Sequence, residues 1–201
     1  LVGSEMCIRD SYKQDHYQLH WNQNYLGGWT SNFGLHYTYG RGFYENYNVG
    51  YDSSDYIDRR WLDNDFYGFI FSVNQRTTKY NSTIGGSYNK YSGEHYGEYL
   101  WIDQDSNSEN SFSFKEKFYD DYGNKNEFNV FAKIDYYLND KLSIYGDLQY
   151  RNIKYEAGIS ANSVFTGYVE EGFSRLDKTF NFFNPKFGLF SLKKESPPFE
   201  Q

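Results

Sequence analysis

Two short stretches of the sequence combine charged and aromatic side chains in a way that suits the binding of a small ligand. The first is RRW at 59–61, and the second is the middle of GEHYGE at 93–98. A guanidinium can pair with an anion and can also stack on an aromatic ring, so an anionic ligand that carries rings fits both side-chain types. The candidate ligand-binding residues are therefore Arg59, Arg60, Trp61, Glu94, His95 and Tyr96.

The two arginines have a second interpretation, because carboxylates lie close to them in the sequence. In that interpretation each arginine forms an ion pair with a neighbouring aspartate and only orders its own loop. The aspartates available for such pairs are Asp55, Asp58, Asp63 and Asp65.

Metal chemistry finds little support in the four histidines. On an extended strand His16 and His20 share a face, yet four residues separate them by about 13 Å, which is too far for one ion. His20 and His36 face each other only if the first hairpin is centred at Gly28, and two histidines without a third ligand make a poor site. We therefore expect no metal site.

Two acidic stretches begin with Asp-x-Asp, as calcium-binding loops do. DNDFYG at 63–68 has Tyr67 at the fifth position, and DQDSNSEN at 103–110 lacks a glycine at the sixth. Neither stretch reaches a glutamate at the twelfth position, where such loops place a bidentate ligand. Solvated acidic loops are the favoured interpretation.

The sequence also lacks the common signatures of catalysis. It contains no nucleophile elbow and no glycine loop that could cradle a phosphate. Scattered carboxylates could be paired as in a glycosidase, but nothing fixes their separation. The net charge of -7 argues against a nucleic-acid partner. We expect neither an enzyme nor a bound cofactor.

In the elements that must position these residues, apolar and polar side chains alternate with a period of two residues. In LNDKLSIYGDLQYR at 138–151, apolar residues from Leu142 onward alternate with polar ones, which only an extended strand turns into two distinct faces. Similar alternation recurs along the chain and predicts an all-β antiparallel meander of about seven strands. The strands are expected near 15–25, 32–40, 65–75, 80–90, 127–138, 142–151 and 182–192.

Short and long links alternate strictly between these strands. The short links lie near 26–31, 76–79 and 139–141, and the long ones near 41–64, 91–126 and 156–179. In a meander this order places every tight turn at one end of the sheet and every long loop at the other, as in outer-membrane barrels.

One face of the predicted strands is free of charge. About twenty-six positions between Tyr17 and Tyr150 fall on it and none is charged, whereas about six would be charged at random for this composition. Lipid enforces such an exclusion, and a dry protein core enforces it too. Lipid is favoured because half of the set is aromatic, as interfacial girdles require. No apolar run approaches the roughly 18 residues of a membrane-spanning helix. The pattern predicts part of a transmembrane β-barrel.

Five stretches of the chain share a likeness to one family of proteins: LHYTYGRGFYENY (35–47), RRWLDNDFYG (59–68), GGSYNKYSGEHYGE (85–98), KLSIYGDLQYRNIKY (141–155) and FFNPKFGL (182–189). Together they resemble the barrel of TonB-dependent outer-membrane receptors. The resemblance implies a barrel of about 22 strands closed by an N-terminal plug. It also implies import of a scarce nutrient across a bacterial outer membrane, with a ferric siderophore as the default cargo and a glycan or a corrinoid as alternatives. Extracellular loops would capture the ligand, and the TonB complex would move the plug.

The chain divides into three parts in this interpretation. Residues 1–11, which contain the only cysteine, look like a non-native leader, 12–192 form the partial barrel, and 193–201 form a tail. We expect an internal fragment of the receptor without its plug. The alternative is a soluble or surface-attached aromatic-rich β-sheet module that binds carbohydrate on exposed Tyr and Trp.

Two hairpins allow the strand register to be predicted. Around 139–141 the apolar positions are even on both strands, which pairs Leu138 with Leu142 and Ile134 with Gly146 across a loop of odd length. Near Thr77 the apolar positions are odd-numbered before the turn and even-numbered after it. The numbers of two facing residues must therefore add up to an odd number, which we call an odd register sum, and the turn must contain an even number of residues.

Overall fold

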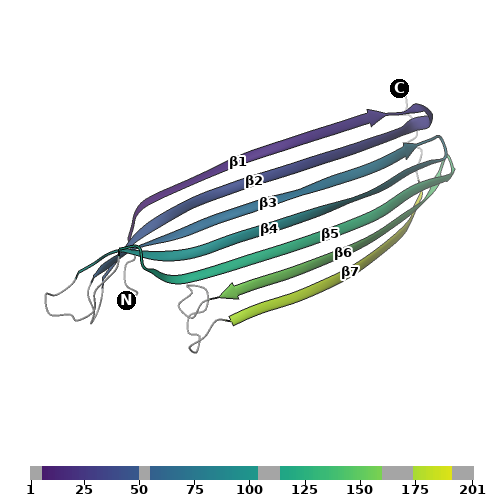
Figure 1. The fold of residues 1–201 in the computed structure, drawn as a ribbon. Helices are drawn as coiled ribbons and strands as arrows, with labels where there is room; N and C mark the ends of the chain where they lie inside the picture. Colours follow the sequence, from purple (N-terminus) through teal and green to yellow (C-terminus); the bar gives the residue numbers. More distant parts are fainter. Residues whose placement is uncertain (1–5, 50–54, 104–113, 160–173, 192–201) are drawn as a thin grey trace, which may run out of the picture.

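The computed structural model describes residues 6–49, 55–103, 114–159 and 174–191, which form one seven-stranded sheet. Each strand pairs antiparallel with the next along the chain, so the predicted all-β meander is confirmed. Figure 1 shows a single curved layer, with the short hairpins together at one end. The elements are β1 (Met6–Asn24), the 3-10 turn η1 (Leu26–Gly28), β2 (Trp29–Asn48), β3 (Tyr56–Arg76), β4 (Tyr80–Ile102), β5 (Lys117–Asn139), β6 (Leu142–Ile159) and β7 (Ser174–Ser191).

The strands extend well beyond their predicted ends, and the three long links are correspondingly shorter than predicted. They occupy 49–55, 103–116 and 160–173. The prediction stopped each strand where alternation stops, but a ladder of backbone hydrogen bonds can continue where both faces are polar. No helix among the described residues is long and apolar enough to cross a membrane.

The predicted leader overlaps the first strand. Residues 6–11 belong to β1 and pair with the far end of β2, where Ser11 lies opposite Phe43 and Met6 opposite Tyr47. Whether these residues are native stays a prediction. The predicted tail at 193–201 lies outside the described residues.

The register joins the apolar residues of all seven strands into one continuous band. Residues that are cross-strand partners share a face of the sheet. We call the apolar residues that are joined in this way, together with their neighbours on the same face, the apolar band. The side of the sheet that carries the apolar band is the band side, and the opposite side is the polar side. One row of partners across the band consists of Trp21, Phe33, Phe71, Gly86, Val130, Tyr150 and Phe183.

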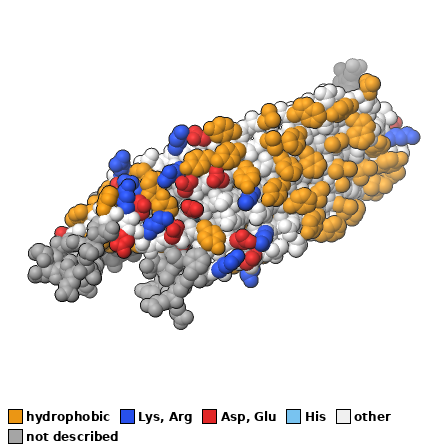
Figure 2. Space-filling model, viewed as in Figure 1, with side chains coloured by type: hydrophobic (Ala, Val, Ile, Leu, Met, Phe, Trp, Pro, Cys, Tyr) orange, Lys and Arg blue, Asp and Glu red, His pale blue; other side chains and the backbone are white. Residues whose placement is uncertain are grey.

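No second layer of described residues covers the band. Leu19 is 62% exposed, Ile84 is 58% exposed and Phe187 is 77% exposed. Within the described ranges only Tyr119 and Ile153 are buried hydrophobic residues. In Figure 2 hydrophobic side chains cover the part of the visible face nearer the short hairpins, and charged side chains gather toward the opposite ends of the strands. The sheet therefore lacks an ordinary hydrophobic core and leaves its band open.

The polar side is connected by hydrogen bonds between side chains of neighbouring strands. Asn32 Nδ2 donates to Ser72 Oγ at 3.1 Å, and Gln149 Nε2 donates to Asn129 Oδ1 at 2.9 Å. A ring nitrogen of His36 lies 2.9 Å from Asn89 Oδ1, two strands away. These ladders satisfy polar groups that face away from the band.

The hairpins confirm part of the predicted register. Ile134 lies opposite Gly146 as predicted, but Leu142 faces Asn139, and the register shifts between Tyr137 and Asn139. The predicted Leu138–Leu142 pair and the odd loop length are therefore wrong. The inserted residue Leu138 is a bulge, and it reconciles a two-residue turn with an even register sum.

The other two short hairpins give one confirmation and one correction. Near Thr77 the pair Arg76–Asn81 has the predicted odd sum, with four residues between the partners. In the first hairpin Gly34 lies opposite His20, so His20 and His36 do not face each other.

The upper edge of the apolar band, on the side of the long links, crosses the strands obliquely. It begins at Tyr17 in β1 and at Tyr67 in β3, which share a row. In β7 it begins at Phe183, whose row passes through Trp21, four residues further along β1. Four residues of rise, about 13 Å, over six strand spacings of about 4.8 Å give a slope of roughly 25°. The strands are therefore tilted relative to the band.

Candidate functional site

The six predicted ligand-binding residues lie on two adjacent strands rather than in loops. β3 carries 59–61 and β4 carries 94–96, and the register places Trp61 opposite Tyr96 and Leu62 opposite His95. The structure therefore brings the two stretches together, although the predicted location in loops is wrong. Their strands continue past the apolar band, where alternation no longer reveals them.

Strand geometry divides the six residues between the two sides of the sheet. Successive side chains on a strand point in opposite directions. Arg60 and His95 lie on the polar side, whereas four residues lie on the band side, so the six cannot form one binding site. The four on the band side are Arg59, Trp61, Glu94 and Tyr96.

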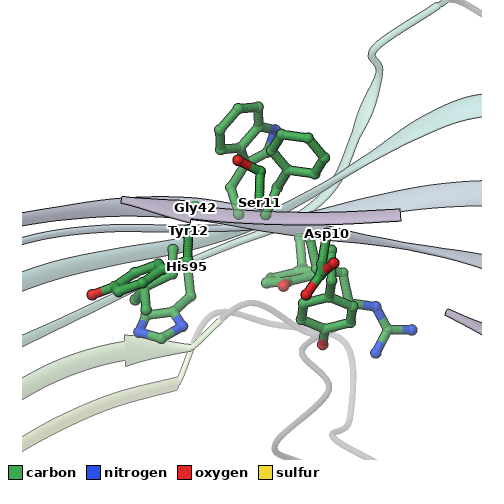
Figure 3. Close-up of a pocket in the computed structure, with 11 residues that line it drawn as sticks. Asp10, Ser11, Tyr12, Gly42 and His95 are labelled. Carbon is green, nitrogen blue, oxygen red and sulfur yellow. The ribbon is translucent and has the colours of Figure 1, made fainter. Parts of the chain in front are cut away.

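A hollow of about 360 Å³ lies beside Arg60 and His95, next to β1. In Figure 3 Asp10, Tyr12 and His95 point to one side of the strand, and Ser11 points to the other. Polar-side residues dominate its lining. They are Asp10, Tyr12, Tyr44, Arg60, Leu62, His95 and Tyr119.

A buried ion pair fixes Arg60 at this hollow. Its Nε donates to Asp58 Oδ2 at 2.6 Å, and Asp58 is fully buried. Asn48 Nδ2 donates to the other carboxylate oxygen at 2.5 Å. The guanidinium also lies over the ring of Tyr44, 6.0 Å from its centroid. Arg60 is therefore held rigidly, with its charge balanced by Asp58.

Burial and local charges set the protonation of the two predicted residues on this side. Burial disfavours the charged form of Arg60, but the hydrogen bond and the attraction of Asp58 outweigh it and raise the pKa of the guanidinium. Burial lowers the pKa of His95, and Asp121 opposes this shift in part. At neutral pH the hollow presents a cationic guanidinium that is already paired and a neutral imidazole.

A glycine shapes the β1 wall of the hollow. A Cβ at Gly42 would lie 2.5 Å from Tyr12 Cδ2 and 2.5 Å from the Ser11 carbonyl oxygen. Backbone atoms cannot yield at that distance, so a side chain at this position would displace β1.

A second group of residues occupies the band side, beyond the end of the apolar band. Arg59 Nε donates to Glu45 Oε1 at 2.9 Å, and Trp61 Nε1 donates to Glu98 Oε2 at 3.2 Å. The rings of Trp61 and Tyr96 are stacked with centroids 6.1 Å apart. We call this group the outer cluster. Its members are Arg41, Phe43, Arg59, Trp61, Tyr96 and Lys117.

The pairing with a neighbouring aspartate, which the alternative interpretation predicted, is found for one of the two arginines. Arg60 pairs with Asp58, as that interpretation allowed. Arg59 instead pairs with Glu45, and Asp63 pairs with Arg41. These pairs order strands rather than a loop, and they leave ligand binding by Arg60 untested.

Several residues of the hollow were not found from the sequence. Tyr12, Tyr44 and Tyr119 come from β1, β2 and β5, and they meet Arg60 only through the register of the five strands β1 to β5. These three tyrosines share one sequence signal, because each occupies a position whose odd or even number assigns it to the polar side of its strand. That signal could have identified them once the strand ends were known.

Metal ligands are not gathered in the described part of the chain, where no group of three or more His, Cys, Asp or Glu could hold an ion. The Asp-x-Asp stretch at 63–68 lies within β3, and most of 103–110 lies outside the described residues.

No protein-family model and no curated protein matches the chain. Among solved structures, the chain is similar to the ferric-catecholate import receptor Fiu of Escherichia coli K12 in its closed form. The TM-score is 0.63 at 11% sequence identity, and the match covers 92% of the chain but 31% of the receptor. The chain thus spans about a third of the receptor's length. At this identity the likeness shows a shared fold, that of part of a β-barrel receptor.

Proposed function

We propose that this chain forms part of an outer-membrane β-barrel receptor of the TonB-dependent type, which imports a small nutrient into a bacterium. The band side faces lipid, the polar side faces the lumen, and the long links lie outside the cell. The plug and the TonB complex are the expected partners in energy coupling. A ferric siderophore is the default cargo, because the matched receptor imports a ferric catecholate.

The oblique apolar band carries this proposal. Strands of outer-membrane barrels are tilted by about 35–45° and present an uncharged band about 25 Å tall. The β5 part of the band, Phe128 to Tyr136, has a length that suits a strand crossing a bilayer obliquely. In water such an uncovered face is a site of aggregation, and a soluble carbohydrate-binding module would need a layer over it.

Within the lumen we assign ligand contact to the hollow beside Arg60 and His95. Tyr44 is exposed there, and phenol rings with hydroxyl donors suit a ligand that carries rings and acceptor oxygens. Asp58 balances the charge of Arg60, so this site would bind mainly by stacking and hydrogen bonding rather than by net charge.

Partitioning tests the membrane assignment. Sheet edges inside lipid must be paired, and an open sheet in water leaves the band uncovered. We expect the 201-residue chain to be insoluble without detergent and unable to restore uptake to cells that lack a complete receptor. Soluble, monodisperse material that unfolds cooperatively without detergent would contradict the proposal and favour the carbohydrate-binding module.

Ligand titration tests the hollow. We expect the iron(III) tris-catecholate complex to quench the tryptophan fluorescence of the chain in detergent. His95→Ala with Tyr44→Phe should weaken this binding about tenfold, through loss of ring and hydrogen-bond contacts. Glu94→Gln is the matched control, because residue 94 adjoins His95 in β4 but points to the band side. Equal losses in both variants would contradict the assignment.

A further inference from the structure

The polar side of the sheet carries an excess of negative charge around the hollow. The described residues that line the hollow or lie next to it on that side include three carboxylates, Asp10, Asp58 and Asp121, but one cation, Arg60. Arg60 is already held at 2.6 Å by the fully buried Asp58. An anionic ligand would have to replace this buried partner, which is costly, and it would also meet the charge of the other carboxylates. The hollow therefore disfavours anions.

Asp121 is the carboxylate that matters most, since Asp10 lies within the predicted leader. Asp121 lies opposite His95 in the register and is 5% exposed. Its charge opposes the effect of burial, which lowers the pKa of His95. Burial is the largest cause that raises the pKa of the Tyr119 phenol, and Asp121 raises it further. A buried negative charge thus acts on two side chains of the hollow, where a low local dielectric strengthens its effect.

Phenol rings form much of the accessible surface of the hollow. Tyr12 is 54% exposed and Tyr44 is 43% exposed, whereas Tyr119 is buried. A Cβ at Gly42 would lie 2.5 Å from Tyr12 Cδ2, and one at Gly40 would lie 2.5 Å from the Tyr12 hydroxyl oxygen, so this ring extends along β2 beside both glycines. The face of an aromatic ring is negative and attracts a cation. Exposed rings and a buried carboxylate together suit an organic cation.

We propose that the hollow binds the ammonium group of an organic cation that also carries an aromatic ring. The ammonium contacts the faces of Tyr12 and Tyr44 within the field of Asp121, and the ring of the ligand packs against Leu62. A volume of about 360 Å³ suits a small ligand of this kind. The inference rests on the proposed function, because it takes the hollow as the ligand site, and it adds the charge of the ligand. The iron(III) tris-catecholate complex is anionic and should bind more weakly than a cation with similar rings.

Three phenols that differ in one terminal group test the charge of the ligand. Tyramine ends in an ammonium, tyrosol in a hydroxyl and hydroxyphenylpropionate in a carboxylate. Each is titrated at neutral pH into a complete barrel that contains these seven strands, in a nonionic detergent, and ligand-observed NMR gives the Kd. We expect tyramine to bind about tenfold more tightly than tyrosol, because only the ammonium is attracted by the rings and by Asp121. Hydroxyphenylpropionate should bind more weakly than tyrosol.

Two substitutions test the groups that attract the ammonium. Asp121→Asn removes the buried charge at nearly constant size and should reduce the preference for tyramine over tyrosol from about tenfold to about threefold. Asp135→Asn is the matched control and should leave the preference unchanged, because residue 135 lies on the same strand and the same side but near the short hairpins, opposite Asn81. Tyr12→Leu, at an exposed position of an edge strand, should also lower the preference, through loss of a ring.

The outcomes separate this inference from the proposed function. Equal affinities for the three phenols, or no binding of tyramine, would overturn the inference. If the tris-catecholate complex still binds in that case and still responds to His95→Ala with Tyr44→Phe, the hollow remains the ligand site. If neither the phenols nor the complex binds, both statements are wrong. If Asp121→Asn does not fold, as judged by circular dichroism, Tyr12→Leu and added salt decide, and a preference for tyramine that neither of them lowers overturns the inference.

Discussion

A charge placed in the centre of the apolar band should destabilise the protein by an amount that identifies its surroundings. Ala132 lies in β5 between Ile84 of β4 and Leu148 of β6, on the band side, and it is exposed. An arginine on the lipid face of a barrel costs about 2–4 kcal/mol at the bilayer midplane. On a face that contacts water the same change would stay within about 0.5 kcal/mol.

The matched control lies one residue along the strand. Lys133 points to the polar side, where its Nζ lies 4.0 Å from Asp147. Lys133→Arg therefore places the same guanidinium at the same depth but on the other side of the sheet. We expect this substitution to change the free energy of unfolding by less than about 0.5 kcal/mol.

Urea titration of a complete barrel that contains these seven strands, in phosphatidylcholine vesicles and followed by tryptophan fluorescence, measures both variants. We expect Ala132→Arg to lower the free energy of unfolding by about 2–4 kcal/mol relative to Lys133→Arg. Equal stabilities of the two variants would refute the lipid-facing assignment of the band.

Two further predictions concern the polar side near the hollow. Asp58→Asn leaves Arg60 as an uncompensated buried charge and should cost about 3–5 kcal/mol in the same urea assay. Asp15→Asn breaks the exposed pair with Lys13 and should cost less than about 1 kcal/mol, and equal costs would contradict the buried role of Asp58. Because burial lowers the pKa of His95, the folded state binds fewer protons than the unfolded state, so its stabilising contribution is complete above about pH 6.5 and is lost as the pH falls through the lower folded-state pKa. Stability measured from pH 7.5 to 5 should therefore fall less steeply in His95→Gln than in the parent, and identical slopes would refute a buried His95.

The sequence predicts the sheet well where one face of a strand differs from the other. Around Phe128 to Tyr136 the alternation marks both the strand and its facing, and the structure places Ile134 opposite Gly146 as the parity requires. The Leu138 bulge was not predicted, because it depends on the geometry of the turn. The extra residue allows a two-residue turn to connect strands whose facing residue numbers add up to an even number.

The candidate site was harder to predict because its strands have polar residues on both faces. Without alternation, Arg59 and Arg60 looked like neighbours in one loop and were assigned to one ligand. Their positions in β3 separate them, since adjacent strand residues point in opposite directions. The contact of Tyr119 with the hollow depends on the register between β4 and β5, which places Tyr119 opposite Gly97 and which no local pattern shows.

Spin labels along one strand test the central claim most directly. In a complete barrel that contains these seven strands and whose native cysteines, Cys7 included, are replaced by Ser, single cysteines introduced from 124 to 138 in β5 can each be labelled after reconstitution in vesicles. We expect accessibility to oxygen, which concentrates in lipid, to peak at even positions from 128 to 136 and to fall at the odd positions between them. At 124 and 126 a water-soluble nickel complex should be the stronger relaxant. Nickel-complex accessibility as high at the even positions from 128 to 136 as at 124 would contradict a membrane-facing band.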